Sequence, residues 1–200
     1  MVEDDYDGEF RYDRQPVGAL QGLDPQRVVY AGTTSKSLAP GVRLAWLVLP
    51  PWLLEPVVEA KRLADRHTVA LDQLVLAELL VSGGFDRHLR RCRLRYRRRR
   101  DRLYAAIAER VASLRLEGIA AGLHAVTFLP ERGPTEREAL AHAASRSVAM
   151  DGLSRFYWHT TNDPSTQGLV IGYTKPPEHA FAAALDSLTG VLAELYQPAR

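Results

Sequence analysis

Short apolar runs alternate with longer helical patterns along the chain. Apolar or alternating residues predict strands at Val2 to Tyr6, Val28 to Ala31, Arg43 to Leu49, Gly122 to Leu129 and Leu169 to Thr174, with shorter ones at Val148 to Met150 and Phe156 to Trp158. Helical spacing predicts helices over Trp52 to Asp65, Leu71 to Val81, Thr135 to Ser145 and from Pro176 to about Leu195. The strands and long helices beyond Gly118 predict a small α+β unit.

Local signals support these bounds. Thr135 is followed three residues later by Glu138, which is the spacing of a capping box. Gly83 and Gly84 follow the second helical pattern and predict its end. Residues 11–27 contain two prolines and two glycines without a sustained period, so they predict a loop.

The arginine-rich stretch from Arg87 to Arg102 suggests a nucleic-acid-binding helix at first sight. Its apolar residues recur at helical spacing, at Leu89, Cys92, Tyr96, Leu103 and Ile107. One stripe of a long helix therefore packs inward, and the arginines occupy the remaining faces. A solvated or interface helix is favoured over a DNA-binding one, because no second helix with a tight turn precedes it.

Composition sets wider bounds. A hydrophobic share of 46% supports a packed core, and a net charge of +2 is too small to indicate nucleic-acid binding. Cys92 is the only cysteine, which excludes an internal disulfide and suits the cytoplasm. No apolar stretch approaches the roughly 18 residues of a membrane span. We expect a cytoplasmic protein without a membrane segment or a metal site.

Lys36 lies in a polar turn between two strand patterns. The chain has three lysines against 23 arginines, so a lysine at this position suggests a role that needs a primary amine. An amine can lose its proton and condense with an aldehyde, which a guanidinium cannot do. The hydroxyls of Thr33 and Ser35, with Arg43, are suited to a phosphate. The alternative is a solvated polar loop.

A second group of candidate residues lies at the start of the chain. If Val2 to Tyr6 is extended, Asp4 and Tyr6 point to one face and Asp5 to the other. A carboxylate and a phenol then share a site, as a pyridoxal phosphate enzyme requires for the pyridine nitrogen and the phenolic oxygen. The alternative is an acidic surface loop.

Two stretches carry a specific resemblance. Residues 3–12 read Glu-Asp-Asp-Tyr-Asp-Gly-Glu-Phe-Arg-Tyr, and residues 28–43 read Val-Val-Tyr-Ala-Gly-Thr-Thr-Ser-Lys-Ser-Leu-Ala-Pro-Gly-Val-Arg. This order resembles the aminotransferase-like domain of the MocR-type regulators, a branch of the GntR family. Those proteins fuse a winged helix-turn-helix to a fold-type-I domain that binds pyridoxal phosphate (PLP). Further similar segments are Gln73 to Glu78, Phe85 to Arg90 and Ile171 to Tyr173.

The resemblance implies a role for each candidate. Lys36 resembles the Schiff-base lysine, Asp4 the partner of the pyridine nitrogen, and Tyr6 the residue on the phenolic oxygen. Thr33 and Arg43 resemble phosphate ligands. For an amino acid or amine effector the implied contact is Lys175, which stands where many aminotransferases place an arginine; Arg155 is the next candidate. A lysine meets a carboxylate as a point charge, without a bidentate fork.

The resemblance also implies an architecture of α/β followed by α+β. Residues 1–60 would end the large PLP-binding domain, residues 61–115 would form linking helices, and residues 116–200 the small carboxy-terminal domain. Because the first residues already read as strand, we expect a fragment that lacks the DNA-binding domain and the first half of the cofactor domain. Contact with DNA would then occur only through the absent domain. We also expect a homodimer, and weak PLP binding by these residues alone.

Three functions are compatible with these observations. The favoured one is an effector-sensing, PLP-binding domain of a transcription regulator that does not turn over a substrate. The alternative is an aminotransferase in which Lys36 also carries the substrate α-proton. A non-catalytic remnant is the third.

Overall fold

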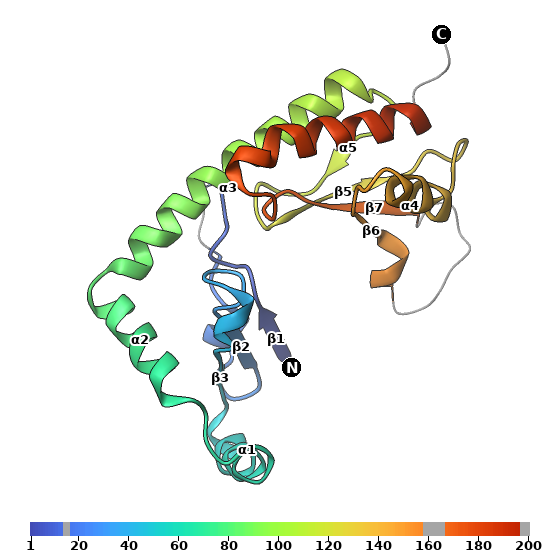
Figure 1. The fold of residues 1–200 in the computed structure, drawn as a ribbon. Coiled ribbons are helices and arrows are strands. Elements are labelled where there is room, and N and C mark those ends of the chain that lie inside the picture. Colours follow the sequence, from blue (N-terminus) through green and yellow to red (C-terminus); the bar gives the residue numbers. More distant parts are fainter. Residues whose placement is uncertain (14–16, 158–166, 197–200) are drawn as a thin grey trace. The chain divides into compact units, whose positions relative to one another are not determined.

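The structure is a computed structural model that describes residues 1–13, 17–157 and 167–196. The chain divides into two compact units, Met1–Arg93 and Leu94–Arg200. Helix α3 (Gly84–Arg110) is continuous through the boundary, as Figure 1 shows. We describe each unit by itself.

The first unit contains a three-stranded sheet in the order β1-β2-β3. β1 (Val2–Asp5) pairs in parallel with β2 (Val29–Thr33), and β3 (Ala45–Val48) pairs antiparallel with β2. The three predicted strands are confirmed, although β3 starts later than expected. Arg43 adopts a left-handed conformation with φ of 54°, which interrupts the extended backbone before Leu44.

Three helices follow this sheet. α1 (Pro51–Ala64) and α2 (Ala70–Val81) confirm the two helices predicted from apolar spacing, and α3 follows directly. The predicted loop contains one short 3-10 turn, η1 (Leu20–Gly22), and the Pro-Gly break forms a second, η2 (Pro40–Val42). Within the described residues, no helix is long and apolar enough to cross a membrane.

The core of the first unit contains no residue of α1 or α2. Its buried apolar side chains are Phe10, Tyr12, Val28, Leu44, Leu89 and Cys92. Neither α1 nor α2 buries a single residue, although both carry a predicted apolar stripe. Most apolar side chains of these two helices are therefore exposed, among them Leu54, Val58, Leu71 and Leu80.

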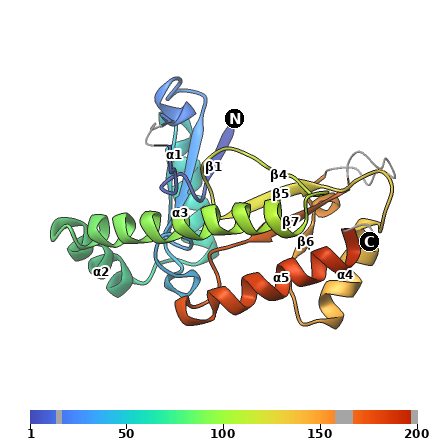
Figure 2. The same cartoon turned by 90° about the horizontal axis from the view of Figure 1, so that it is seen from above.

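The second unit is built on a four-stranded antiparallel sheet in the order β4-β5-β7-β6. Its strands are β4 (Leu116–Glu117), β5 (His124–Phe128), β6 (Asp151–Gly152) and β7 (Gly168–Gly172). α5 (Phe181–Tyr196) lies over the sheet in Figure 1, and Figure 2 shows α4 (Glu136–Ser145) near the end of α5. Leu103, Ile171 and Leu188 line one small cavity of about 40 Å³, so α3, β7 and α5 share a core.

Two predicted strands of the second unit are wrong. Residues 148–150 are not extended pairing residues, because Ser147 takes a left-handed φ of 59° and the Val148 amide bonds back to the Ala143 carbonyl. Pairing begins only at β6. Phe156 lies in the 3-10 turn η3 (Leu153–Phe156) instead of a strand, while Trp158 lies outside the described residues.

The capping box at the start of α4 is confirmed. The Thr135 hydroxyl accepts from the Glu138 amide, and the Glu138 carboxylate accepts from the Thr135 amide at 2.8 Å. The hydrogen bond from the Thr135 amide is the largest of the causes that lower the pKa of Glu138 below its ordinary value.

The last helix starts later than predicted. The segment after β7 forms the short 3-10 turn η5 (Glu178–Ala180), and α5 begins only after this turn instead of at Pro176.

The arginine-rich helix mostly follows its predicted pattern. Leu89, Cys92, Leu103 and Ile107 are buried, and Tyr96 is half-buried. One arginine departs from the expectation: Arg99 is only 3% exposed. Its guanidinium donates to the Thr174 carbonyl at 2.9 Å and to Glu178 at 2.7 Å, and it stacks 4.8 Å from the centre of the Phe181 ring. Arg99 thus anchors the segment that follows β7.

Candidate functional site

The parallel pairing of β1 with β2 organises the candidate site. Asp4 is level with Ala31, and Asp5 with Gly32, so both strands end at the same edge of the sheet. The turn that carries Lys36 begins directly after Thr33, at the end of β2. Asp4 and the lysine turn are consequently at one sheet edge.

The acidic residues on either side of Asp4 have structural partners. The Glu3 carboxylate accepts the amides of Leu20 and Gln21, both at 3.0 Å, and so holds the η1 turn. The Asp5 carboxylate accepts the Gly8 amide at 2.9 Å. Asp4 alternates to the other side of the strand and is exposed. This arrangement leaves the Asp4 carboxylate available for a ligand.

Asp5 also fixes the neighbouring strand. Its second oxygen accepts the Tyr30 hydroxyl at 3.0 Å. Burial, and next this hydrogen bond, raise the pKa of Tyr30 to about 12. Gly8 has no room for a side chain, because a Cβ there would lie 2.3 Å from an Asp5 oxygen. The chain therefore turns tightly after β1, immediately beyond Tyr6.

Tyr6 and Lys36 face one another. The Lys36 Nζ lies 5.8 Å from the centre of the Tyr6 ring, and both side chains are exposed. Burial first, and then the charges of Asp7 and Asp4, raise the pKa of Tyr6 above its ordinary value. Near neutral pH the Tyr6 hydroxyl thus keeps its proton and can donate a hydrogen bond.

The predicted hydroxyl cluster is partly assembled. The Thr33 hydroxyl lies 2.9 Å from the Ser35 hydroxyl, and the Ser35 amide donates to Thr33 Oγ1 at 3.1 Å. Thr33 also donates to the Leu44 carbonyl at 3.1 Å, which ties the start of the turn to the residue before β3. Arg43, adjacent to Leu44, is exposed in its left-handed conformation. The three polar groups proposed for a phosphate therefore belong to the segment between the end of β2 and the start of β3.

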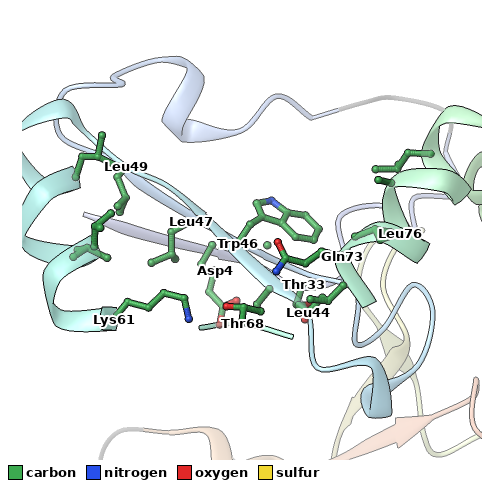
Figure 3. Close-up of a pocket in the computed structure, with 18 residues that line it drawn as sticks. Asp4, Thr33, Leu44, Trp46, Leu47, Leu49, Lys61, Thr68, Gln73 and Leu76 are labelled. Atoms are coloured by element: carbon green, nitrogen blue, oxygen red, sulfur yellow. Dashed lines mark hydrogen bonds between the residues drawn. The ribbon is translucent and has the colours of Figure 1, made fainter. Parts of the chain in front are cut away.

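A hollow of about 780 Å³ lies beside this edge, between the sheet and the helices α1 and α2 (Figure 3). Asp4 and Thr33 contribute its polar lining next to Thr68 and Gln73. The exposed apolar residues that line it, which we call the apolar face, are Trp46, Leu47, Leu54, Val58 and Leu80.

The hollow also contains an amine that the sequence analysis did not single out. Lys61 lines it from α1, whereas Lys36 is not one of its lining residues. Lys61 is paired with Asp65 at 2.8 Å, and both side chains are more than half exposed. Two of the three lysines of the chain therefore belong to the first unit, and a test must distinguish them.

Gly32 leaves room for the ring of Trp46 beside the hollow. The ring of Trp46, opposite Gly32 in β3, occupies the space where a side chain at Gly32 would lie: a Cβ there would be 2.4 Å from the ring. Any larger residue would displace this tryptophan, which lines the hollow.

The two candidates for effector binding lie in the second unit. Lys175 is exposed and lies three residues after the end of β7. Arg99 donates hydrogen bonds to the Thr174 carbonyl just before Lys175 and to Glu178 just after it. Arg155 lies in η3 and pairs with Asp151 at 2.9 Å, with both side chains largely exposed. Whether either residue lies near Lys36 stays a prediction.

Two further residues were missed by the sequence analysis. His88 of α3 lies 2.8 Å from the Ser37 carbonyl, next to Lys36. Glu136, at the start of α4, is only 8% exposed and accepts hydrogen bonds from η3 and β7. His88 lay within a segment noted only for its resemblance, and Glu136 resembled an ordinary first-turn acid.

Known proteins place the chain in a family. No protein-family profile matches it. The chain is 36% identical over 197 residues to the HTH-type transcriptional regulator YhdI of Bacillus subtilis, covering 98% of this chain and 41% of YhdI. It is 33% identical over 198 residues to the probable rhizopine catabolism regulatory protein MocR of Rhizobium meliloti, covering 98% and 39%.

A solved structure agrees with these relatives. Kynurenine aminotransferase of Pyrococcus horikoshii, in complex with PMP, has a TM-score of 0.84 and 28% identity, covering 96% of this chain and 47% of the enzyme. The chain is the carboxy-terminal part of a MocR-type aminotransferase-like domain. It spans about 40% of the length of the regulators above. Its fold is that of the fold-type-I PLP aminotransferases, and the cofactor expected for this MocR-type domain is PLP.

The polar side chains at this edge of the sheet suit that cofactor. The MocR-type chain offers an exposed amine for an aldehyde, an exposed carboxylate for a pyridine nitrogen, and a phenol whose raised pKa keeps its proton. The hydroxyls of Thr33 and Ser35 are within hydrogen-bonding distance of each other, as two ligands of one phosphate would be. In kind, these residues fit one side of a PLP site.

Proposed function

We propose that this chain is the PLP-binding, effector-sensing part of a MocR-type transcription regulator of the cytoplasm. The observation that carries the proposal is the parallel pairing of β1 with β2, which sets Asp4 beside the turn of Lys36. The identity to two regulators over nearly the whole chain supports the regulatory role. DNA would be bound by a winged helix-turn-helix elsewhere in the full protein.

Each side chain has a distinct task in this proposal. When bound, PLP supplies a pyridinium ring that withdraws electrons. The Asp4 carboxylate would hold the proton at the ring nitrogen, and the Tyr6 hydroxyl would donate to the phenolic oxygen. Thr33, Ser35 and Arg43 would bind the phosphate through hydrogen bonds and one fixed positive charge. Lys36 would supply the amine that fastens the group.

An aminotransferase is the second candidate, because the solved structures with the same fold are aminotransferases. The two functions differ in what precedes these residues in the gene. A winged helix-turn-helix in the same reading frame upstream of Met1 supports the sensor. A free-standing aminotransferase reading frame, together with multiple turnovers of an amino acid and a 2-oxo acid, would contradict it.

The first prediction concerns the effector. If an amino acid binds through its carboxylate to Lys175, replacing Lys175 by alanine should weaken it about tenfold to a hundredfold, because one charge-assisted hydrogen bond is lost. PLP attachment should not change. Calorimetric titration of amino acids into the PLP-treated protein measures the effector affinity, and the yellow absorbance measures PLP attachment, with Lys61→Ala as the matched control. Equal affinity in Lys175→Ala and the control would exclude Lys175 and direct the test to Arg155→Ala.

The second prediction concerns self-association. We propose that the chain forms a homodimer, because the apolar face leaves Leu54 and Val58 more than half exposed on one helix. The double change Leu54→Asp with Val58→Asp should shift the sedimenting mass toward the 22.3 kDa of one chain. Glu55→Gln, exposed on the same helix, is the control and should leave the mass unchanged. A wild-type chain that sediments as a monomer would refute the proposal.

A further inference from the structure

The turn that carries Lys36 is held from two sides. On the sheet side, the Thr34 amide and hydroxyl both donate to the Leu44 carbonyl, at 3.0 and 3.2 Å, and Thr34 is fully buried. Within the turn, the Leu38 amide donates to the Thr34 carbonyl at 2.8 Å. Thr34 therefore fixes the entry to the turn, two residues before the amine.

On the other side, the turn meets α3. His88 Nε2 lies 2.8 Å from the carbonyl oxygen of Ser37, a residue 51 positions earlier in the chain and adjacent to Lys36. Ser37 is 2% exposed, and its own hydroxyl finds no hydrogen-bond partner in the part of the chain that the structure describes. The Ser37 carbonyl is thus the polar group through which α3 holds the exit of the turn.

The contact with the Ser37 carbonyl determines which ring nitrogen of a neutral His88 carries the proton. A carbonyl oxygen only accepts, so a nitrogen at this distance must carry the proton. His88 therefore has its proton on Nε2 when neutral. The Cys92 sulfur lies 3.4 Å from the same nitrogen, one helical turn along α3, and packs against the donor. An imidazolium would keep the Nε2 proton as well, so the contact to Ser37 survives protonation.

We infer that His88 is a positioning residue for Lys36: by holding the Ser37 carbonyl, it sets the direction in which the Lys36 amine leaves the turn. The inference rests on the proposed function of Lys36 as the attachment point of PLP. With Ser37 and Thr34 both fixed, the intervening backbone has little freedom, and the Lys36 side chain extends toward the Tyr6 ring. Without the His88 contact, only the Thr34 side of the turn would be held.

Two variants separate the hydrogen bond from the packing. His88→Gln keeps an N–H donor on a side chain of similar reach, and His88→Leu keeps an apolar side chain without a donor. Lys175 is an internal reference, because it is exposed and belongs to the second unit. A general loss of folding would change both lysines, whereas a loss of positioning would change Lys36 alone.

The experiment has two readouts on the 200-residue chain. Hydrogen exchange at the Leu38 amide needs no cofactor, and borohydride trapping with PLP gives the ratio of pyridoxyl on Lys36 to that on Lys175. We expect His88→Leu to speed exchange at Leu38 roughly tenfold and to lower the ratio severalfold, and His88→Gln to restore both. Unchanged Leu38 exchange in His88→Leu, or faster exchange with an unchanged ratio, would overturn the inference while leaving the proposed function intact. A wild-type chain without pyridoxyl on Lys36 would overturn the proposed function. The role of His88 in positioning that amine would then fall as well. Exchange at the Leu38 amide would in that case show only whether His88 holds the turn.

Discussion

Replacing Lys36 by alanine is expected to abolish the saturable, covalent attachment of PLP to this chain. The physical reason is that Lys36 supplies the amine that faces Tyr6, and a methyl group cannot bond to an aldehyde. The measurement is the yellow absorbance that develops with PLP, followed over a range of cofactor concentrations. Attachment is expected to be weak in these residues alone, so millimolar cofactor concentrations are appropriate.

Lys61→Ala is the matched control for this experiment. Lys61 lines the same hollow as Asp4 but is paired with Asp65, so its removal should leave the absorbance unchanged. If instead Lys61→Ala loses the signal and Lys36→Ala retains it, the attachment point is on α1 and the assignment of Lys36 is wrong.

The largest expected effect on stability is that of Glu136→Ala. The buried Glu136 carboxylate accepts the amides of Ser154 and Gly168, both at 3.1 Å, and also the Ser154 hydroxyl. Its removal leaves these donors without their partner and opens a gap beside Gly152, where no Cβ fits against the Glu136 carboxylate. We expect a loss of about 3 to 5 kcal/mol in the free energy of unfolding of the second unit.

Denaturant unfolding with a probe in the second unit measures this loss. Glu138→Ala is the control, since Glu138 lies on the same helix but is exposed and caps only the helix end. Glu136→Gln should fall between wild type and Glu136→Ala, because its amide oxygen can still accept the Ser154 and Gly168 amides but without the negative charge that strengthens these hydrogen bonds. Equal stability in Glu136→Ala and Glu138→Ala would show that the buried Glu136 carboxylate does not stabilise the second unit more than the exposed Glu138 does.

Local patterns were sufficient to predict most elements of this fold. The capping box of Thr135 and Glu138 involves residues three apart, so its physics is contained in the sequence itself. The alternation that separates Asp4 from Glu3 and Asp5 follows likewise from strand geometry. The resemblance around Lys36 added the cofactor, which the polar turn by itself left open between a site and a solvated loop.

Contacts between distant residues could not be predicted in this way. Arg99 was expected on a solvated face, but the Thr174 carbonyl and Glu178, more than 70 positions later, pair its charge and allow its burial. The η3 turn stands where a strand was predicted. The Ser154 amide in this turn donates to the Glu136 carboxylate, and the apolar pattern around Phe156 does not reveal this contact. The contact of His88 with Ser37 depends in the same way on tertiary structure.

The expected division into residues 1–60, 61–115 and 116–200 stays a prediction. The boundary between the two compact units falls inside α3, which carries buried residues on both sides of it, such as Leu89 and Ile107. A helix with one continuous apolar stripe gives no sequence signal for a boundary, because the period does not change where the packing partner does.

The most direct test of the proposed function is to map where PLP attaches in the unmodified protein. The chain has only three lysines, so borohydride reduction after incubation with PLP, followed by peptide mass spectrometry, distinguishes Lys36, Lys61 and Lys175 in one experiment. We predict saturable pyridoxyl labelling of Lys36, with Lys61 and Lys175 labelled only in proportion to cofactor concentration. Equal, unsaturable labelling of all three lysines would contradict a PLP site at Lys36.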